Sequence, residues 1–203
     1  MIYKSKQFWN ERFDTKEYIY GVEPNAFLKQ IIDNVPPGKI LLPAEGEGRN
    51  AVYCAKKGFI VDCFDQSEVA KNKALKLANN ENVNINYLVS DIEDFDYKIN
   101  EYDYIGIFFL HLSKTQSENF YKLLIKSLKP GGKIIIEVFS KIIYENQTAG
   151  PKDLSLRYNI EDFKEYLKSF NFIVFEQKDV DLNEGSRHQG KSNVIRIFAE
   201  KTI

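Results

Sequence analysis

The stretch Leu41-Leu42-Pro43-Ala44-Glu45-Gly46-Glu47-Gly48-Arg49-Asn50-Ala51 decides the fold. Its pattern predicts an apolar strand that runs into two glycines and a helix that begins directly after them. Glycine has no Cβ, so the backbone can turn tightly there and approach a bound nucleotide or nucleoside closely. The free N–H groups of the first helical turn point into the same crevice. The stretch therefore predicts a loop that holds a cofactor.

Strand and helix patterns alternate along the chain, which predicts an α/β fold with a mostly parallel sheet covered on both faces. A polar, glycine-containing segment separates the last two strands, so we expect these two to pair antiparallel. The predicted strands are Lys39–Pro43, Phe59–Asp65, Ile85–Val89, Tyr102–Leu110, Lys133–Phe139, Phe172–Val180 and Ser192–Lys201. The predicted helices are Asn25–Val35, Arg49–Lys57, one that Ser67 caps, Gln116–Leu128 and Glu161–Phe170. We expect a single domain over residues 1–203.

The composition excludes several classes of protein. Lys and Arg (28) nearly cancel Asp and Glu (29), so no overall field favours nucleic acid. No apolar run approaches the ~20 residues of a membrane span, and no apolar region of a signal peptide follows Met1–Lys6. Cys54 and Cys63 form no ligand or redox motif, so we expect buried thiols in a cytoplasmic protein and no metal site.

The glycine pattern alone does not identify the cofactor, because Gly46-x-Gly48-x-x-Ala51 also fits a plain structural turn. Asp65 closes the second predicted strand and is placed to accept hydrogen bonds from the hydroxyls of a ribose. Such charge-assisted bonds contribute about 1.5–3 kcal/mol each. The alternative for Asp65 is a turn residue before the Ser67 cap. Loop and acid together favour an adenosine-containing ligand and leave NAD and S-adenosylmethionine open.

The rest of the chain favours S-adenosylmethionine. Little sequence remains for the substrate domain of a nicotinamide dehydrogenase, and Asp91-Ile92 after the third strand can meet the amino group and the face of an adenine. The turn Leu128-Lys129-Pro130-Gly131-Gly132-Lys133 precedes a hydrophobic strand, and a terminal antiparallel pair follows. From Trp9 to Lys201 the chain resembles the class I S-adenosylmethionine-dependent methyltransferases, among them the small bacterial enzymes of the tellurite-resistance and thiopurine methyltransferase group.

This resemblance implies a seven-stranded sheet of order 3-2-1-4-5-7-6, a cofactor-covering segment over residues 1–35 and a Rossmann-like core over residues 36–203. It implies S-adenosyl-L-methionine as cofactor, S-adenosyl-L-homocysteine as product and a small-molecule methyl acceptor. The residues that it assigns to the cofactor are Arg12 and Tyr20 in the covering segment, Glu45, Gly46, Gly48 and Asn50 in the loop, Asp65 and Gln66 at the ribose, Asp91 and Ile92 at the adenine, and Phe108 and Phe109 beside the sulfonium. For Arg12 the alternative is a solvated helix arginine.

The loop departs from the family pattern at one place. The usual acid three residues before the first glycine is missing, since Leu42, Pro43 and Ala44 occupy that stretch, while Glu45 directly precedes Gly46. We expect the Glu45 carboxylate to supply the negative charge for the methionine ammonium.

The two histidines are the candidate bases. A thiolate, selenolate or reduced oxyanion needs little base catalysis, whereas an oxygen or nitrogen nucleophile needs a base with a pKa near 7. His111 follows the fourth strand, where an acceptor is expected, and His188 lies in a Glu-Gly-x-x-His-x-Gly pattern that recurs in relatives of the same group. We favour His188; the alternatives are a packed strand-end His111 and a surface-loop His188. Arg157 and Arg187 are either contacts of an anionic acceptor or solvated charges.

Other functions stay open at this stage. A nucleic-acid methyltransferase is disfavoured by the neutral charge and by Phe108-Phe109-Leu110-His111, where amino-base methylases carry an Asn/Asp-Pro-Pro-aromatic motif. A regulatory protein that binds S-adenosylmethionine without catalysis, and less so a nicotinamide oxidoreductase, are further alternatives. The acceptor is a thiol, a chalcogen oxyanion, an amine or a carboxylate, and the sequence is silent on oligomeric state.

Overall fold

The computed structural model describes residues 5–145, 147 and 149–202. These residues form two compact units. Unit 1 is the chain up to Phe95 together with Glu184–Ser186, and unit 2 is the remainder from Asp96 onward. The first four residues of the predicted covering segment, and with them most of the segment Met1–Lys6, lie outside the described residues. Two positions of the long loop 141–158, residues 146 and 148, lie outside them as well.

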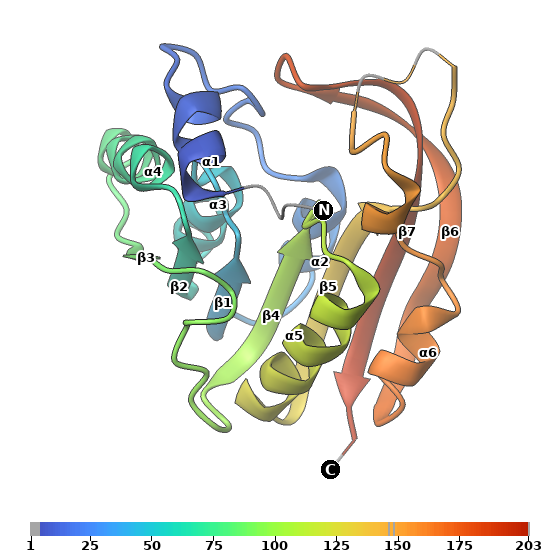
Figure 1. Cartoon of the computed structure of the whole chain (residues 1–203). Coiled ribbons are helices and arrows are strands. Elements are labelled where there is room, and N and C mark those ends of the chain that lie inside the picture. Colours follow the sequence, from blue (N-terminus) through green and yellow to red (C-terminus); the bar gives the residue numbers. More distant parts are fainter. Residues whose placement is uncertain (1–4, 146, 148, 203) are drawn as a thin grey trace. The chain divides into compact units, whose positions relative to one another are not determined.

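The strands form one seven-stranded sheet of order β3-β2-β1-β4-β5-β7-β6, which confirms the predicted fold class (Figure 1). β1 pairs parallel with β2, β2 with β3 and β4 with β5, whereas β7 pairs antiparallel with β5. The strands are β1 (Lys39–Pro43), β2 (Ile60–Asp65), β3 (Asn86–Val89), β4 (Tyr102–Phe108), β5 (Leu128–Phe139), β6 (Phe170–Glu184) and β7 (His188–Lys201). The helices are α1 (Lys6–Phe13), α2 (Ala26–Ile32), α3 (Arg49–Lys56), α4 (Glu68–Asn80), α5 (Lys114–Ser127), α6 (Asp162–Tyr166) and the 3-10 turn η1 (Leu154–Leu156).

In unit 1 the local sequence sets where the helices begin. The Asn25 side chain accepts the N–H groups of Phe27 and Leu28 and so caps α2, and the Ser67 hydroxyl accepts the Ala70 N–H and caps α4 as predicted. The inner face of α4 is buried, also as predicted; its residues are Ala70, Ala74, Leu77 and Ala78. α2 ends at Ile32, three residues before the predicted end at Val35.

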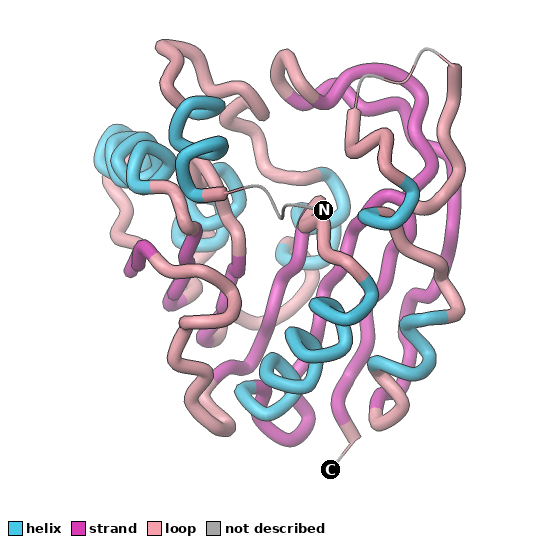
Figure 2. The backbone as a smooth tube through the Cα atoms, viewed as in Figure 1, coloured by secondary structure: helices cyan, strands magenta, loops and turns pink. Residues whose placement is uncertain are grey.

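In unit 2 the predicted strands are present but their ends differ. β6 and β7 are longer than predicted, and only Gly185–Arg187 connects them, which makes them an antiparallel hairpin (Figure 2). The prediction that His188 lies between the strands is therefore wrong, because it is the first residue of β7. The helix predicted over Glu161–Phe170 is only α6, because Phe170 already begins β6. α5 and α6 lie side by side (Figure 1).

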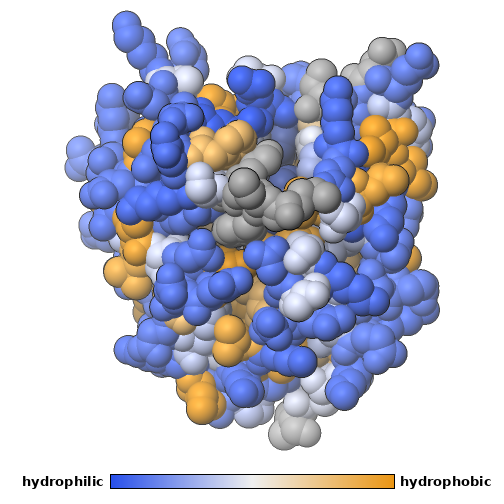
Figure 3. All heavy atoms as spheres, viewed as in Figure 1, coloured by the Kyte–Doolittle hydropathy of each residue, from blue (hydrophilic) through white to orange (hydrophobic). Residues whose placement is uncertain are grey.

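Hydrophilic side chains cover most of the face shown in Figure 3, and apolar ones appear there in separate small areas. In the part of the chain that the structure describes, no helix has both the length and the apolar character that crossing a membrane requires. The same residues contain no group of three or more His, Cys, Asp or Glu side chains arranged to hold a metal ion. Cys54 and Cys63 are free thiols and buried, in agreement with the prediction.

Candidate functional site

The loop between β1 and α3 carries a left-handed residue at every second position. The φ angles are 51° at Ala44, 62° at Gly46 and 88° at Gly48. Glycine adopts such angles without cost, whereas an L-residue with a Cβ is strained there. Ala44 therefore occupies a position where the backbone favours glycine, so the loop has the form of a three-glycine turn with its first glycine replaced. Sequence reasoning missed this, because alanine carries no turn signal.

We expect Ala44→Gly to stabilise the protein by about 1 kcal/mol, because the substitution removes a left-handed conformation from a residue with a Cβ. Urea denaturation measures the change. The control is Ala51→Gly in helix α3, where the same chemical change removes a buried methyl group and lowers helix propensity, so it must destabilise. A loss of stability in Ala44→Gly similar to that in Ala51→Gly would contradict this assignment.

The Glu45 side chain turns toward the start of α3. Its Oε1 accepts the Ala51 N–H at 2.7 Å and its Oε2 accepts the Asn50 Nδ2 at 3.4 Å. Burial raises the pKa of the Glu45 carboxyl to about 7, although these hydrogen bonds and the nearby Arg49 charge act in the opposite direction. The carboxylate thus links the loop to the first turn of α3. A cationic ligand beside the carboxylate would favour its ionised form.

Asp65, at the end of β2, holds the same loop from the other side. Its Oδ2 accepts the Gly46 N–H at 3.2 Å, and its Oδ1 accepts the Ser67 N–H at 2.9 Å. The carbonyl of Gly46 accepts the Tyr87 hydroxyl at 2.6 Å. Burial raises the pKa of the Asp65 carboxyl to about 6, and the charge of Asp91 adds to this rise. The structure thus supports both interpretations of Asp65, since it organises the turn and also places a buried carboxylate beside the loop.

The remaining predicted contacts of unit 1 surround this acid. Gln66 follows Asp65 and is half-buried. Asp91 lies in the turn after β3, where its Oδ1 accepts the Glu93 N–H at 3.4 Å and its carbonyl accepts the Phe95 N–H at 3.1 Å. Ile92 is buried and presents an apolar side chain next to that acid in the sequence. Two carboxylates and an apolar residue are thus brought to the loop ends of neighbouring strands β2 and β3.

The N-terminal segment packs on the glycine-rich loop. A Cβ on Gly46 would lie 3.3 Å from Cζ of Phe13, which is the last residue of α1. Trp9 stacks on the same Phe13 ring with centroids 5.5 Å apart. The Arg12 Nε donates to the Tyr20 hydroxyl at 3.2 Å, so these two predicted cofactor contacts lie together in the covering segment. Arg12 lies in α1 and is half-buried, so its role at the cofactor stays a prediction.

Asn50 and Arg49 connect the start of α3 to two other segments of unit 1. The Asn50 Oδ1 accepts the Asn25 N–H at 2.9 Å. The Arg49 Nη2 lies 2.8 Å from Oε2 of Glu184, and both side chains are nearly buried. The hairpin turn also approaches the covering segment so closely that a Cβ on Gly185 would overlap the backbone of Gly21. The turn is thereby fixed on the same side of unit 1 as the loop.

The donors and acceptors of unit 1 fit a cationic nucleoside. A carboxylate has about four acceptor positions, so Asp65 retains capacity for a ribose hydroxyl beyond the backbone N–H groups that it already accepts. Burial raises the pKa values of Glu45 and Asp65, and a positively charged ligand beside them would oppose this rise by favouring the ionised carboxylates. At the start of α3, where a pyrophosphate would be expected to bind, the cation of Arg49 is already paired with Glu184.

In unit 2 the other predicted residues gather around one ring, and we call them the Phe139 cluster: Phe109, His111, Phe139 and His188. The ring centroids of Phe109 and His188 lie 4.5 Å apart, those of Phe139 and His188 5.6 Å, and those of His111 and Phe139 5.8 Å. His188 is 6% exposed, so the surface-loop alternative is wrong. Phe108 packs against a group of buried residues that includes Phe109 and Phe139. The predicted end of this strand at Leu110 is also wrong, because β4 ends at Phe108.

Phe109 has a strained backbone. Its φ angle is 51°, and its N–H donates to the Glu137 carbonyl at 2.8 Å. A bulky residue with a left-handed backbone is rare, and such strain is found most often at functional sites. The turn brings the Phe109 ring against His188 rather than along the strand direction.

Arg157 has a structural role, so neither an acceptor contact nor a solvated charge describes it. It is 4% exposed, and its guanidinium donates to the carbonyls of Pro151 at 2.7 Å, Ser140 at 2.9 Å and Ala149 at 3.3 Å. It also lies over the Phe139 ring, 5.1 Å from the centroid. Arg157 thus fixes the described part of loop 141–158, whereas Arg187 is exposed.

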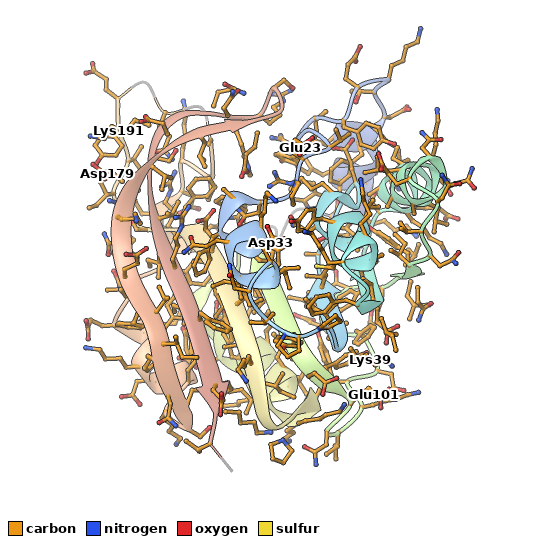
Figure 4. All side chains as sticks on the ribbon, turned by 180° about the vertical axis from the view of Figure 1, so that it is seen from behind. Glu23, Asp33, Lys39, Glu101, Asp179 and Lys191 are labelled. Atoms are coloured by element: carbon orange, nitrogen blue, oxygen red, sulfur yellow. The ribbon has the colours of Figure 1, made fainter. Side chains whose placement is uncertain are left out.

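A polar network on the hairpin holds the same loop at its start. The Tyr144 hydroxyl donates to Oδ1 of Asp179 at 2.5 Å, and Lys191 Nζ lies 3.0 Å from the other Asp179 oxygen. Figure 4 shows Asp179 on β6 and Lys191 on β7 close together. Tyr144 is therefore an anchor of the loop on the sheet.

The fold and this loop define a class of protein. A seven-stranded sheet of order 3-2-1-4-5-7-6 with an inserted antiparallel β7, a glycine-rich turn after β1 and an acid at the end of β2 is the architecture of the class I S-adenosylmethionine-dependent methyltransferases. Residues 40–132 match the family described as "Methyltransferase domain". The chain thus has the fold of this class and is similar to it in sequence over residues 40–132, as the resemblance predicts.

Within the class the chain is similar to TehB. It is 25% identical over 197 residues to the "Probable S-adenosyl-L-methionine-dependent methyltransferase TehB" of Haemophilus influenzae, which covers 96% of this chain and 63% of that protein. The crystal structure of TehB from Haemophilus influenzae superimposes with a TM-score of 0.72 at 19% identity, over 97% of this chain and 67% of that one. The predicted likeness to the tellurite-resistance group is confirmed. The chain spans somewhat less than two thirds of the curated TehB sequences that it matches.

Two further relatives show the breadth of the class. The "Ubiquinone/menaquinone biosynthesis C-methyltransferase UbiE" of Wigglesworthia glossinidia brevipalpis is 32% identical over 115 residues, 54% of this chain and 46% of that protein. The magnesium protoporphyrin IX methyltransferase (ChlM) of Synechocystis PCC 6803, crystallised with bound SAH, superimposes with a TM-score of 0.71 at 13% identity over 97% of both chains. ChlM shares the fold with the chain, and UbiE is similar to it in sequence.

Proposed function

We propose that the chain is an S-adenosylmethionine-dependent methyltransferase that acts on a small-molecule acceptor, with its described units working as one domain. The observation that carries this proposal is the glycine-rich turn of unit 1, closed by Glu45 and Asp65 and covered by the segment from α1 to α2. The methyltransferase family match over residues 40–132 supports it. When bound, the cofactor would supply the activated methyl group. The chain would bind and orient the cofactor and the acceptor, and it would exclude water from them.

In this proposal each part of unit 1 has one task. Glu45 faces the ammonium of the methionine moiety, and Asp65 accepts from the ribose. Asp91 and Ile92 meet the adenine. The covering segment excludes water, and Arg12 is held toward the cofactor carboxylate through its bond to the Tyr20 hydroxyl. Gly46, Gly48, Asn50 and Gln66 shape the backbone around these contacts, and Phe108 and Phe109 are assigned to the sulfonium.

The pH dependence of cofactor affinity tests the role of Glu45. Because the pKa of Glu45 is about 7 without ligand, about one tenth of the carboxyls are ionised at pH 6 and about nine tenths at pH 8. A cation binds the ionised form, so affinity should rise about tenfold between these pH values. Glu45→Gln, which keeps the hydrogen bond from the Ala51 N–H, should lose this dependence and bind more weakly. Equal pH profiles of the two proteins, measured by calorimetry, would contradict the assignment.

The two histidines are proposed as the groups that contact or deprotonate the acceptor, with His188 favoured. We expect His188→Ala to lower the methyl-transfer rate by about 100-fold, the lower end of the range for a general base, with cofactor affinity unchanged. His111→Ala should have the smaller effect. The measurement pairs turnover with calorimetric cofactor titration for each variant. If turnover survives in His188→Ala, the residue has no chemical role and a soft, already ionised acceptor is indicated.

The direct test of the function is a transfer assay with methyl-labelled S-adenosylmethionine. Thiols, selenite, tellurite, small amines and small carboxylates are offered as acceptors, and label in a new product supports the proposal. Binding of the cofactor with no transfer to any member of this panel or to nucleic acid would favour the regulatory alternative. Transfer to RNA or DNA would favour the nucleic-acid methyltransferase.

A further inference from the structure

Lys73, on helix α4, contacts several other segments of unit 1, and no sequence motif indicates these contacts. Its Nζ lies 2.5 Å from Oε1 of Glu47, and it donates to the carbonyls of Glu17 at 2.6 Å, Thr15 at 3.1 Å and Phe13 at 3.3 Å. The Tyr18 hydroxyl donates back to the Lys73 carbonyl at 3.0 Å. One ammonium group thus joins helix α4 to the end of α1 and to the four residues after it, and α1 lies beside α4 in Figure 1.

Glu47 completes this connection from the glycine-rich loop. It stands between Gly46 and Gly48, and its side chain is 1% exposed. Its Oε2 accepts the Tyr20 N–H at 3.4 Å, so the carboxylate binds both Lys73 and the covering segment. Burial raises the pKa of Glu47, and the Lys73 ammonium opposes that rise. A buried carboxylate of this kind depends on its partner, since removing one member of a buried pair leaves an uncompensated charge.

The contacts of the ion pair coincide with the covering segment. Phe13, whose carbonyl Lys73 binds, lies against Gly46. Tyr20, whose N–H Glu47 accepts, receives the hydrogen bond of Arg12. The Ser67 hydroxyl donates to Oδ1 of Asn10 at 2.7 Å, which adds a contact from the cap of α4. The pair therefore lies at the point where the loop, α4 and residues 13–20 meet.

We propose that Glu47 and Lys73 form a clip that holds residues 13–20 on the glycine-rich loop and thereby sets how long the cofactor stays bound. Both are positioning residues, since they act through the covering segment. The inference rests on the proposed function, because the ligand retained is S-adenosylmethionine. Loss of the clip releases the cover, so dissociation of the cofactor accelerates while association changes little.

The experiment uses the full chain, whose single tryptophan, Trp9, lies on the covering segment. For Lys73→Met and for Glu47→Gln we expect at least tenfold faster dissociation of S-adenosylhomocysteine by stopped flow. We also expect stronger quenching of Trp9 fluorescence by acrylamide without ligand, because Trp9 and Phe13 pack with Ala70 of α4 and this packing loosens when the cover is released. The double variant should match the stronger single variant, since both substitutions break one interaction. Lys73→Arg keeps the charge and the donors and should restore most of the retention.

Lys56→Met is the matched control. Lys56 and Glu81 also join α3 to the end of α4, at 2.6 Å, but both side chains are well exposed. The control should leave dissociation and quenching unchanged, with circular dichroism confirming that each variant folds. Quenching and dissociation in Glu47→Gln and Lys73→Met equal to those of Lys56→Met would overturn the clip. If the unaltered chain binds no cofactor, the proposed function fails, and Trp9 quenching still decides whether the clip exists.

Discussion

Asp65→Ala is expected to weaken S-adenosylmethionine binding by about 100-fold. The substitution removes the charge-assisted hydrogen bond that we propose Asp65 makes to the ribose, worth about 1.5–3 kcal/mol. It also removes the acceptor that holds the Gly46 N–H at 3.2 Å, so the loop that shapes the site loosens. Calorimetry measures the affinity. The Asp65→Asn variant retains an acceptor for the backbone N–H groups, so its affinity for S-adenosylmethionine should fall less than that of Asp65→Ala.

Asp62→Ala is the control for this prediction. Asp62 lies on the same strand, β2, where it pairs with Lys39 at 3.0 Å and accepts Nδ2 of Asn86 at 2.9 Å. Neither partner belongs to the proposed site, so cofactor affinity should stay unchanged. The two variants are compared by their affinity for S-adenosylmethionine. If the affinity of Asp65→Ala is within about threefold of that of Asp62→Ala, Asp65 only organises the turn before α4.

The second large effect is expected for Gly48→Ala. A Cβ at this position would lie 2.5 Å from Cβ and 2.9 Å from Cα of Ala74, and the backbone has a φ angle of 88°. Overpacking and left-handed strain together should cost about 3 kcal/mol. The free energy of unfolding, from urea denaturation, measures this loss. Since α3 begins directly after Gly48, cofactor binding should fail as well.

Gly58→Ala separates strain from overlap. Gly58 has a φ angle of 85°, but the nearest atom to an added Cβ is 3.8 Å away, in Pro37. This variant should lose only about 1 kcal/mol, the cost of the left-handed backbone. Equal losses of stability in Gly48→Ala and Gly58→Ala would mean that the close approach of the loop to α4 contributes nothing to the cost of Gly48→Ala. Gly48 would then act through its backbone conformation alone.

The sequence predicted the elements and their order because each depends on local signals. The apolar run Lys39–Pro43, the Ser67 cap and the inner face of α4 all specify structure within one element, and each is confirmed. The extents of β6 and β7 depend on the pairing between strands in the sheet. Residues 184–190 are polar and are typical of a loop, so the sequence does not indicate how far the two strands extend. For this reason the extents of the last two strands, and the place of His188 between them, were predicted wrongly.

The candidate site was predictable where a motif carries it. Gly46 and Gly48 lie between β1 and α3, Asp65 ends β2, and the structure brings Gly46 and Asp65 together. The clip of Glu47 and Lys73 was missed because 26 positions separate its partners, Glu47 fills the variable position of the glycine pattern, and Lys73 belongs to no motif. Arg157 was predicted as a solvent or acceptor contact, since no local pattern indicates that carbonyls of its own loop surround it. Long-range contacts of this kind follow from tertiary packing alone.

Calorimetric titration of the chain with S-adenosylhomocysteine, beside NADH, tests the central claim most directly. In the proposed site, Glu45, Asp65 and the covering segment would hold a cationic or neutral thioether nucleoside, whereas Arg49, the cation nearest a pyrophosphate, is already paired with Glu184. We expect one equivalent of S-adenosylhomocysteine to bind, and NADH to give no heat of binding. Saturable binding of NADH with none of S-adenosylhomocysteine would contradict the account.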